Sequence, residues 1–220
     1  MSLILNIDCA IQSSSVCLAN NEIPLSISIN PSQKDTAAWL HIAINELIKE
    51  EKFCLEQLDA IAVTEGPGSY TGLRVGMATA KGLCYALNKP LITINTLYLM
   101  AFEAKKKFKE FLCPMIDARR MEVFTAVFDH DLNLKLAPTN LILSETSFKD
   151  ILENNYTVFL GNGSIKFQAI MKHSHASFAK VEVDASSMVP LSYKKYKGQE
   201  FADLAYSQPF YGKDFHSLSN

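Results

Sequence analysis

The pattern of apolar positions in the first half of the chain predicts alternating strands and helices. Continuous or alternating apolar residues predict three strands at the start, and Asn20-Asn21 between the last two favours a tight hairpin turn. A helix is then expected from a cap at Asp35 to about Glu51. A further strand, a helix ending near Leu87 and a short strand that leads into another helix follow. The predicted strands of this half are residues 3–8, 15–19, 23–29, 58–64 and 91–94.

The second half repeats this order of elements. A helix capped by Ser144 is expected to end near Glu153, a second helix to end near Met171, and a polar helix to follow Val189. The predicted strands are residues 111–116, 122–128, 139–143 and 158–160. Two successive units of this kind predict an α/β protein with two similar lobes, residues 1–108 and 109–220, each a mixed sheet flanked by helices.

A glycine-rich turn joins the fourth predicted strand to the helix behind it. Its residues are Gly66, Pro67, Gly68, Ser69, Thr71 and Gly72. Ser69 can cap the helix, and the free N–H groups at such a helix start can receive an anion, although a plain strand-to-helix turn is the more ordinary interpretation. The segment is not a Walker loop, which ends in Gly-Lys-Ser/Thr, and Thr71 occupies the third glycine position of the dinucleotide fingerprint.

The helix after this turn and the helix before it carry more apolar surface than two small lobes can bury. Arg74 and Lys81 are the only charges between Tyr70 and Leu87. We therefore expect part of both helices to meet another subunit; the alternative is that both are core helices. When the chain is alone, the same surface favours a homodimer. The predicted interface residues are Trp39, Leu40, His41, Ile44, Tyr70, Leu73, Arg74, Met77 and Lys81.

Composition and charge restrict the possible classes of function. The 220-residue chain has a formal net charge of −2, which argues against its gripping a nucleic-acid backbone alone. No apolar run is long enough to span a bilayer, and the first residues lack the basic region of a signal peptide. The 5 cysteines show no zinc-like spacing and four lie in apolar contexts, which fits buried free thiols in the cytoplasm.

The segment Gly66–Leu83 resembles the signature of the TsaB (YeaZ) family of tRNA threonylcarbamoyladenosine biosynthesis. Residues 3–8, Ser13-Ser14-Ser15-Val16 and Asp117–Phe124 extend the resemblance along most of the chain. It implies the two-lobed fold of actin, sugar kinases and chaperone ATPases. It also implies two partners, the catalytic relative TsaD and the small ATPase TsaE, which would carry the metal and ATP, with tRNA bound only through the complex. In that family the first two helices pack against TsaD or a second copy.

The resemblance also bears on whether the chain is an enzyme. Thr96 and Met100 stand where the catalytic relative carries its metal-binding histidines, so we expect a non-catalytic subunit without bound metal or nucleotide of its own. Asp117, Arg119 and Arg120 look like a catalytic cluster, but a hairpin turn with solvated charges is the default. The alternatives are an independent peptidase or nucleotide hydrolase, with Ser69 as the imagined nucleophile, and a stand-alone RNA-binding module.

Overall fold

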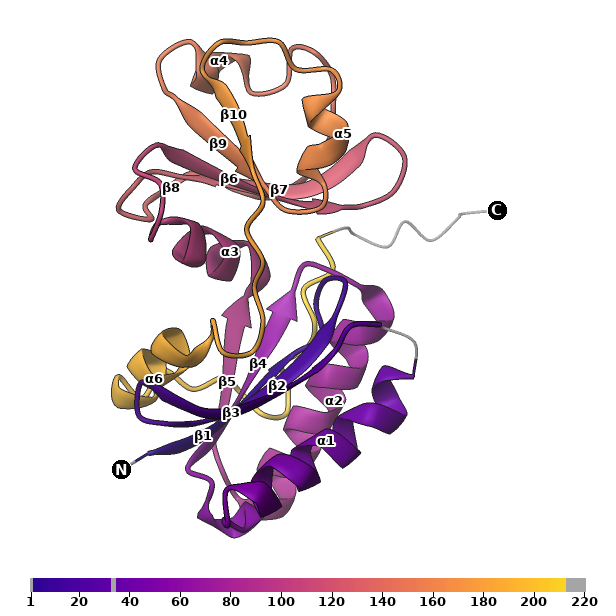
Figure 1. The fold of residues 1–220 in the computed structure, drawn as a ribbon, viewed down its shortest axis with the longest axis vertical. Helices are drawn as coiled ribbons and strands as arrows, with labels where there is room; N and C mark the ends of the chain where they lie inside the picture. The colour runs from indigo at the N-terminus through magenta and orange to yellow at the C-terminus, as the bar shows by residue number, and fades with distance from the viewer. Residues whose placement is uncertain (1, 33–34, 213–220) are drawn as a thin grey trace. The chain divides into compact units, whose positions relative to one another are not determined.

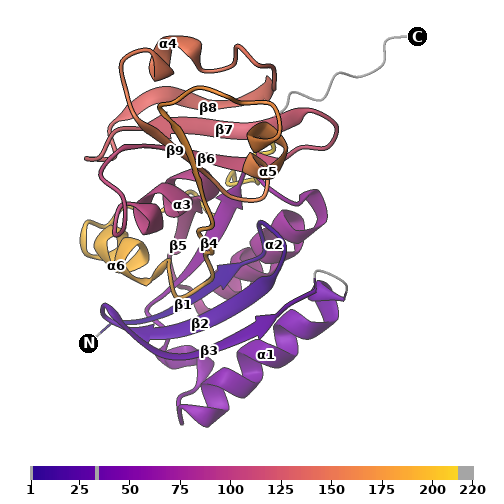
Figure 2. The same cartoon turned by 45° about the horizontal axis from the view of Figure 1, so that its top comes forward.

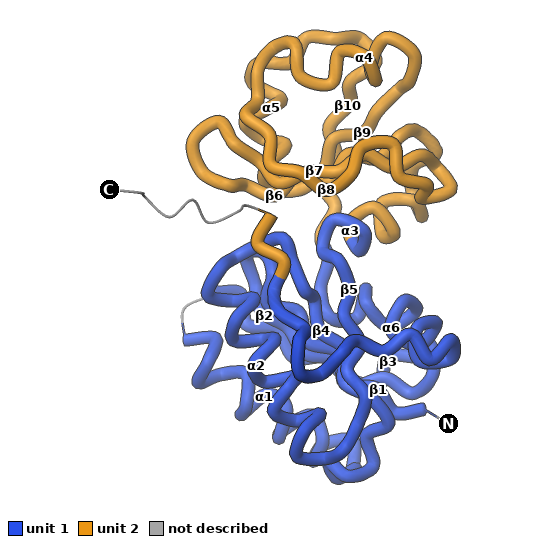
Figure 3. The backbone as a smooth tube through the Cα atoms, turned by 180° about the vertical axis from the view of Figure 1, so that it is seen from behind, with its two compact units in different colours: residues 1–99, 183–209 blue, residues 100–182, 210–220 orange. Residues whose placement is uncertain are grey.

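The computed structural model describes residues 2–32 and 35–212, which form two compact units (Figure 1). The first unit contains residues 1–99 and 183–209, and the second contains residues 100–182 and 210–220 (Figure 3). Each unit is built on its own five-stranded mixed sheet. The predicted two-lobed α/β architecture is confirmed.

The first sheet has the strand order β3-β2-β1-β4-β5. Its central strand β1 pairs antiparallel with β2 and parallel with β4, so the hairpin strands lie on one side and the crossover strands on the other. Every residue of β1 is buried, as its continuous apolar run predicts. The strands are β1 (Leu3–Asp8), β2 (Ser14–Asn20), β3 (Ile23–Asn30), β4 (Ala60–Gly66) and β5 (Leu91–Asn95).

Helices α1 (Thr36–Glu50) and α2 (Tyr70–Leu87) cover one face of this sheet, and α6 (Val189–Lys197) lies on the other (Figure 2). A short 3-10 helix, Leu55–Gln57, follows α1, and α3 (Thr96–Ala104) follows β5. Burying the apolar stripes of α1 and α2 against alternate residues of β1 and β2 makes the core of the unit.

The boundary predicted at residue 108 needs correction, because the chain returns to the first unit near its end. Lys195 of α6 donates from Nζ to the carbonyl of Thr93 on β5, 2.9 Å away. Farther on, Ala202 donates its N–H to the carbonyl of Leu91 and forms a bridge on the open edge of β5. Residues 183–209 therefore belong to the first unit rather than to a lobe of residues 109–220.

The second unit repeats the topology of the first. Its order β10-β9-β6-β7-β8, with β6 antiparallel to β7 and parallel to β9, matches the first sheet strand for strand, so the predicted structural duplication is confirmed. Helices α4 (Lys149–Leu152) and α5 (Ser164–Gln168) contribute the buried residues Leu152 and Phe167 to one core. The strands are β6 (Phe111–Asp117), β7 (Glu122–Phe128), β8 (Leu134–Ile142), β9 (Thr157–Leu160) and β10 (Ala176–Ala179).

Several predicted element ends differ from the structure. Asp35 precedes α1 in a left-handed conformation and its side chain makes no capping hydrogen bond. The helix expected after Ser144 is reduced to the single turn of α4, because Ser144 bonds with its neighbour Ser147 in a turn instead. Strand β10, which the sequence did not predict, pairs with β9 at the sheet edge. Among the described residues, no helix is both long and apolar enough to cross a membrane.

Candidate functional site: the glycine turn, the first two helices and a basic hairpin

The glycine turn packs directly on the turn that joins β1 to β2. A Cβ atom on Gly68 would lie less than 3.0 Å from the carbonyl oxygen of Ala10, and one on Gly72 equally close to that of Cys9. Ser69 donates its N–H to Ala10 O at 2.7 Å, and its hydroxyl accepts from Gly72 N at 3.3 Å, which confirms the predicted cap. These two N–H groups at the start of the helix are therefore hydrogen-bonded within the chain. The glycines of the turn allow the close contact between the two backbone segments.

Asp8, at the end of β1, is buried beside this turn. Its Oδ1 accepts hydrogen bonds from Ala10 N–H at 3.0 Å and from the Thr64 hydroxyl at 2.8 Å. Burial raises the pKa of Asp8 to about 6 because it disfavours the ionised carboxylate; the two hydrogen bonds oppose this rise, and the negative charge of Asp184 adds to it. The carboxyl group is thus a buried, hydrogen-bonded group at the end of β1.

The cysteines are free thiols, and four of the five are buried. Burial raises the pKa of Cys9, Cys17, Cys84 and Cys113 to about 12, which keeps each thiol protonated and unreactive near neutral pH. Cys54 is exposed in a loop. The predicted free thiols are present, and the buried ones serve as packing residues.

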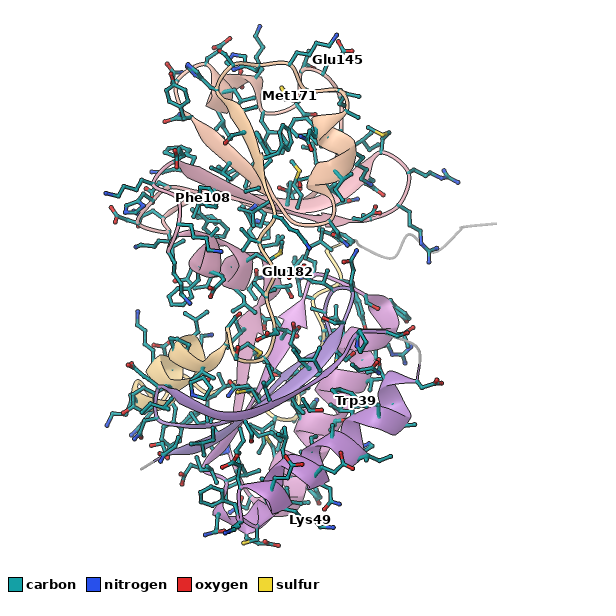
Figure 4. The ribbon with its side chains drawn as sticks, viewed as in Figure 1. Trp39, Lys49, Phe108, Glu145, Met171 and Glu182 are labelled. Carbon is teal, nitrogen blue, oxygen red and sulfur yellow. The ribbon has the colours of Figure 1, made fainter. Side chains whose placement is uncertain are left out.

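The residues predicted to form an interface on α1 and α2 divide into two groups. Leu40, Ile44, Leu73 and Met77 are buried in the core of the unit, and placing them on a docking surface was wrong. The error arose because both helices turn these apolar stripes towards the sheet. The accessible members are His41, Tyr70 and Arg74, which are exposed, and Trp39 and Lys81, which are half-buried (Figure 4 labels Trp39 on α1).

The exposed side of α2 is a stripe of small and aromatic residues. Gly82 lies in open space, with no atom within 4 Å of a built Cβ, and Tyr85 is 84% exposed. Arg74 donates to the Tyr70 hydroxyl at 3.1 Å, and its guanidinium carbon lies 5.2 Å from the centre of that ring. We define the α2 stripe as Tyr70, Arg74, Ala78, Gly82 and Tyr85, all of which are exposed.

Two further residues, Ile42 and Lys81, affect which parts of α1 and α2 are available for the predicted interface. Ile42 on α1 is 58% exposed, and it lies outside the predicted set of interface residues. Lys81 donates from Nζ to the carbonyls of Ala205 and Ser207, at 3.2 and 2.8 Å. Lys81 therefore holds the end of the first unit against α2, a contact between distant segments that no local pattern could have indicated.

The two positions predicted to correspond to the metal-binding histidines of TsaD lie on α3. Thr96 and Met100 are both fully or almost fully buried there. Neither offers an imidazole or carboxylate to a hard metal ion. Within residues 2–32 and 35–212, no group of three or more His, Cys, Asp or Glu side chains is placed to hold a metal.

The Asp117–Glu122 hairpin is fixed by a lysine that the sequence analysis missed. Lys166 on α5 points its ammonium group into the loop, 2.7 Å from Asp117 Oδ1. The same Nζ donates to the carbonyls of Arg120 at 2.7 Å and Glu122 at 2.6 Å, with Arg119 O at 3.4 Å. The predicted hairpin turn is confirmed, and a cage of oxygens around one ammonium group holds it.

The cage also affects the charge of Asp117. Partial burial favours its protonated form, but hydrogen bonds from Lys166 and from the Arg119 N–H, with the attraction of both cations, outweigh burial and lower the pKa of Asp117. The carboxylate is therefore ionised at neutral pH and compensates the charge of Lys166.

Replacing Lys166 with methionine should destabilise the second unit. The substitution keeps the aliphatic stem but leaves Asp117 and the loop carbonyls without their donor, and bonds to charged groups contribute about 2 kcal/mol. Urea unfolding should report a loss of this size. Lys172→Met, at an exposed position of the same unit, should change the free energy of unfolding by less than about 0.5 kcal/mol. Equal effects of the two changes would show that the cage contributes nothing.

Comparison with known proteins places the chain among tRNA-modification proteins. The family model for TsaD, the tRNA N6-adenosine threonylcarbamoyltransferase, matches residues 29–210, which is more than half of the chain. The tRNA threonylcarbamoyladenosine biosynthesis protein TsaB of Bacillus subtilis is 28% identical over 127 residues, covering 58% of this chain and 55% of that protein. The chain spans between 51% and 60% of the length of this and two further TsaB relatives that it matches.

Solved structures show the same fold. YeaZ from Pseudomonas aeruginosa superposes with a TM-score of 0.81 and 23% identity, covering 96% of this chain and 100% of that one. The activator of 2-hydroxyisocaproyl-CoA dehydratase from Clostridium difficile, solved with bound ADPNP, superposes with a TM-score of 0.51 and 10% identity over 90% of this chain and 97% of that one. The fold is therefore shared with YeaZ and with this activator.

Proposed function

Because this chain belongs to the family that the TsaD model describes and is similar to TsaB (YeaZ) proteins, we propose that it is a non-catalytic partner subunit in tRNA threonylcarbamoyladenosine formation. It would dock the threonylcarbamoyltransferase TsaD through α1 and α2 and work with the ATPase TsaE. ATP, metal and tRNA would be held by the complex rather than by this chain alone. The proposal includes a cytoplasmic location, where the chain would meet its tRNA substrate.

The observation that carries the docking proposal is the exposed α2 stripe. Small residues allow a second helix to approach closely, and Tyr85 offers a large amphipathic side chain of the kind enriched at interfaces. Ile42 of α1 adds exposed apolar area on the neighbouring helix. The net charge of the chain is only −2, so strong electrostatic repulsion of a partner protein is not expected.

Three features support a non-catalytic role. Thr96 and Met100 supply no metal ligands, and the Ser69 hydroxyl acts as a helix cap, bonded to Gly72 N. The buried cysteines are protonated thiols and therefore poor nucleophiles. An independent peptidase or nucleotide hydrolase would need an activated nucleophile that these residues do not provide.

The test is reconstitution with TsaD and TsaE, threonylcarbamoyl-adenylate and unmodified tRNA. Gly82→Glu places a charge in the α2 stripe without an internal clash, since a Cβ at this position meets no atom within 4 Å. We expect this variant to fold, to lose both TsaD binding and the homodimer in sedimentation experiments, and to abolish modification. Gly82→Ala is the matched control and should support modification as the parent does.

Each outcome decides between the hypotheses. Modification that proceeds equally well without the chain contradicts the partner role. If the isolated chain hydrolyses ATP or a peptide, and Asp8→Ala or Ser69→Ala stops it, the enzyme alternative is correct. Loss of the homodimer with intact TsaD binding in Gly82→Glu would show that the two assemblies use different surfaces.

A further inference from the structure

We propose that the Asp117–Glu122 hairpin is a phosphate-binding element, in which Arg119 and Arg120 contact the backbone of the RNA substrate. This inference rests on the proposed function, which supplies an RNA, and adds a role to a part of the second unit that docking does not use. The two arginines are consecutive, exposed and at the end of a hairpin.

The backbone conformation of the hairpin is unfavourable for arginine. Arg119 and Arg120 have φ angles of 70° and 47°, in the left-handed region that asparagine and glycine adopt most easily. Each non-glycine residue there costs about 1 kcal/mol or more. Two adjacent arginines are therefore unfavourable for the backbone of this turn. We infer that their side chains are present to bind a ligand.

The Lys166 cage holds this conformation in place. Its ammonium group bonds to the carbonyls of both arginines and of Glu122, and so fixes the peptide groups that set the direction of the loop. A hairpin fixed before binding loses little conformational entropy when a ligand arrives. The cage therefore fixes the backbone from which the two exposed arginine side chains extend.

The local charge of the hairpin is positive. Asp117 compensates Lys166, and the Glu122 carboxylate accepts a hydrogen bond from Asn140. Among the described residues, neither Arg119 nor Arg120 forms a salt bridge. The three cations Arg119, Arg120 and Lys166 outnumber the two carboxylates Asp117 and Glu122, so the hairpin with Lys166 is positive in a chain whose overall charge is −2.

Phosphate is the anion that suits this arrangement under the proposed function. The planar guanidinium group binds two phosphate oxygens at once, and phosphate contacts position a protein on a nucleic acid without reading its sequence. A weakly acidic chain can contribute such contacts only where positive charge is concentrated locally. The hairpin is a place of this kind.

The test removes both guanidinium groups with residues that suit the backbone. Arg119→Asn with Arg120→Gly keeps the positive φ angles, so thermal unfolding should stay near that of the parent. In the complex with TsaD and TsaE, affinity for unmodified tRNA at about 0.15 M salt should fall roughly 20-fold. The slope of log affinity against log salt should become shallower by about 1 to 2. Lys172→Gln with Lys180→Gln removes the same charge from exposed positions of the same unit and should change neither.

The possible results separate this inference from the proposed function. If the chain is required for modification and the Asn-Gly variant keeps the parental affinity and salt slope, the hairpin does not bind RNA. If the variant instead fails to assemble with TsaD, the arginines bind carboxylates of a protein, which also contradicts the inference. If the complex modifies tRNA without the chain, the proposed function fails first.

Discussion

Gly72→Ala should unfold the first unit or destabilise it by about 4 kcal/mol or more, because the new methyl group would overlap the carbonyl oxygen of Cys9. The clash cannot be relieved by rotating a flexible side chain, because the new Cβ and the Cys9 carbonyl are both fixed by the backbone. Both belong to backbone, in a helix start and in a turn, so relief requires α2 to move away from β1. Thermal and urea unfolding measure the loss.

Gly82→Ala is the matched change ten residues later in the same helix. A Cβ at Gly82 meets no atom within 4 Å, so alanine adds helix propensity without a clash and should stabilise the chain by up to about 1 kcal/mol. If the two variants have equal stability, the close contact between the glycine turn and the Cys9–Ala10 turn is not present in the protein.

Asp8→Asn should stabilise the chain at neutral pH and remove a pH dependence. The folded pKa of Asp8 is about 6 against an ordinary value of 3.8, so the folded state binds the proton more tightly than the unfolded state. The stability contributed by this protonation is present in full below pH 3.8 and is lost as the pH rises through about 6. At about 1.4 kcal/mol per pKa unit, the loss approaches 3 kcal/mol.

The difference between parent and variant isolates this one carboxyl group. Asparagine keeps an Oδ1 that accepts from Ala10 N–H and from Thr64, so the two hydrogen bonds should survive. The stability advantage of Asp8→Asn, followed by urea unfolding from pH 4 to pH 7.5, should grow between pH 4 and about 6.5 and then stay constant. A constant difference across the whole range would mean that Asp8 is ionised throughout.

Local patterns predicted the fold well where one residue's chemistry was sufficient. The continuous apolar run of β1 and the cap at Ser69 are properties of short segments, and both are present. Asp35 has the right side chain for a cap, but its left-handed backbone takes the carboxylate away from the helix N–H groups. Strand β10 carries little signal of its own because it exists through its pairing with β9.

The candidate site was harder to predict because it depends on contacts between distant segments. The spacing of apolar residues on α2 does not show which side of the helix faces the core. Packing on the sheet buries Met77 and leaves Gly82 and Tyr85 exposed. Lys166 lies 49 residues from Asp117, and nothing in its own neighbourhood indicates a cage. Lys81 binds the carbonyl of Ser207 across 126 residues. Such contacts are invisible to any pattern that extends over one element.

The return of residues 183–209 to the first sheet determines the order in which the units are completed during synthesis. Strands β1 to β5 are synthesised first. The contacts of Ala202 with the edge of β5 and of Ser207 with α2 can form only later, because both residues are synthesised after residues 100–182. The second unit's sheet is contiguous in the chain and can form in that interval. The sheet that is made first is therefore the one whose edge is covered last, after every strand of the second sheet has been synthesised.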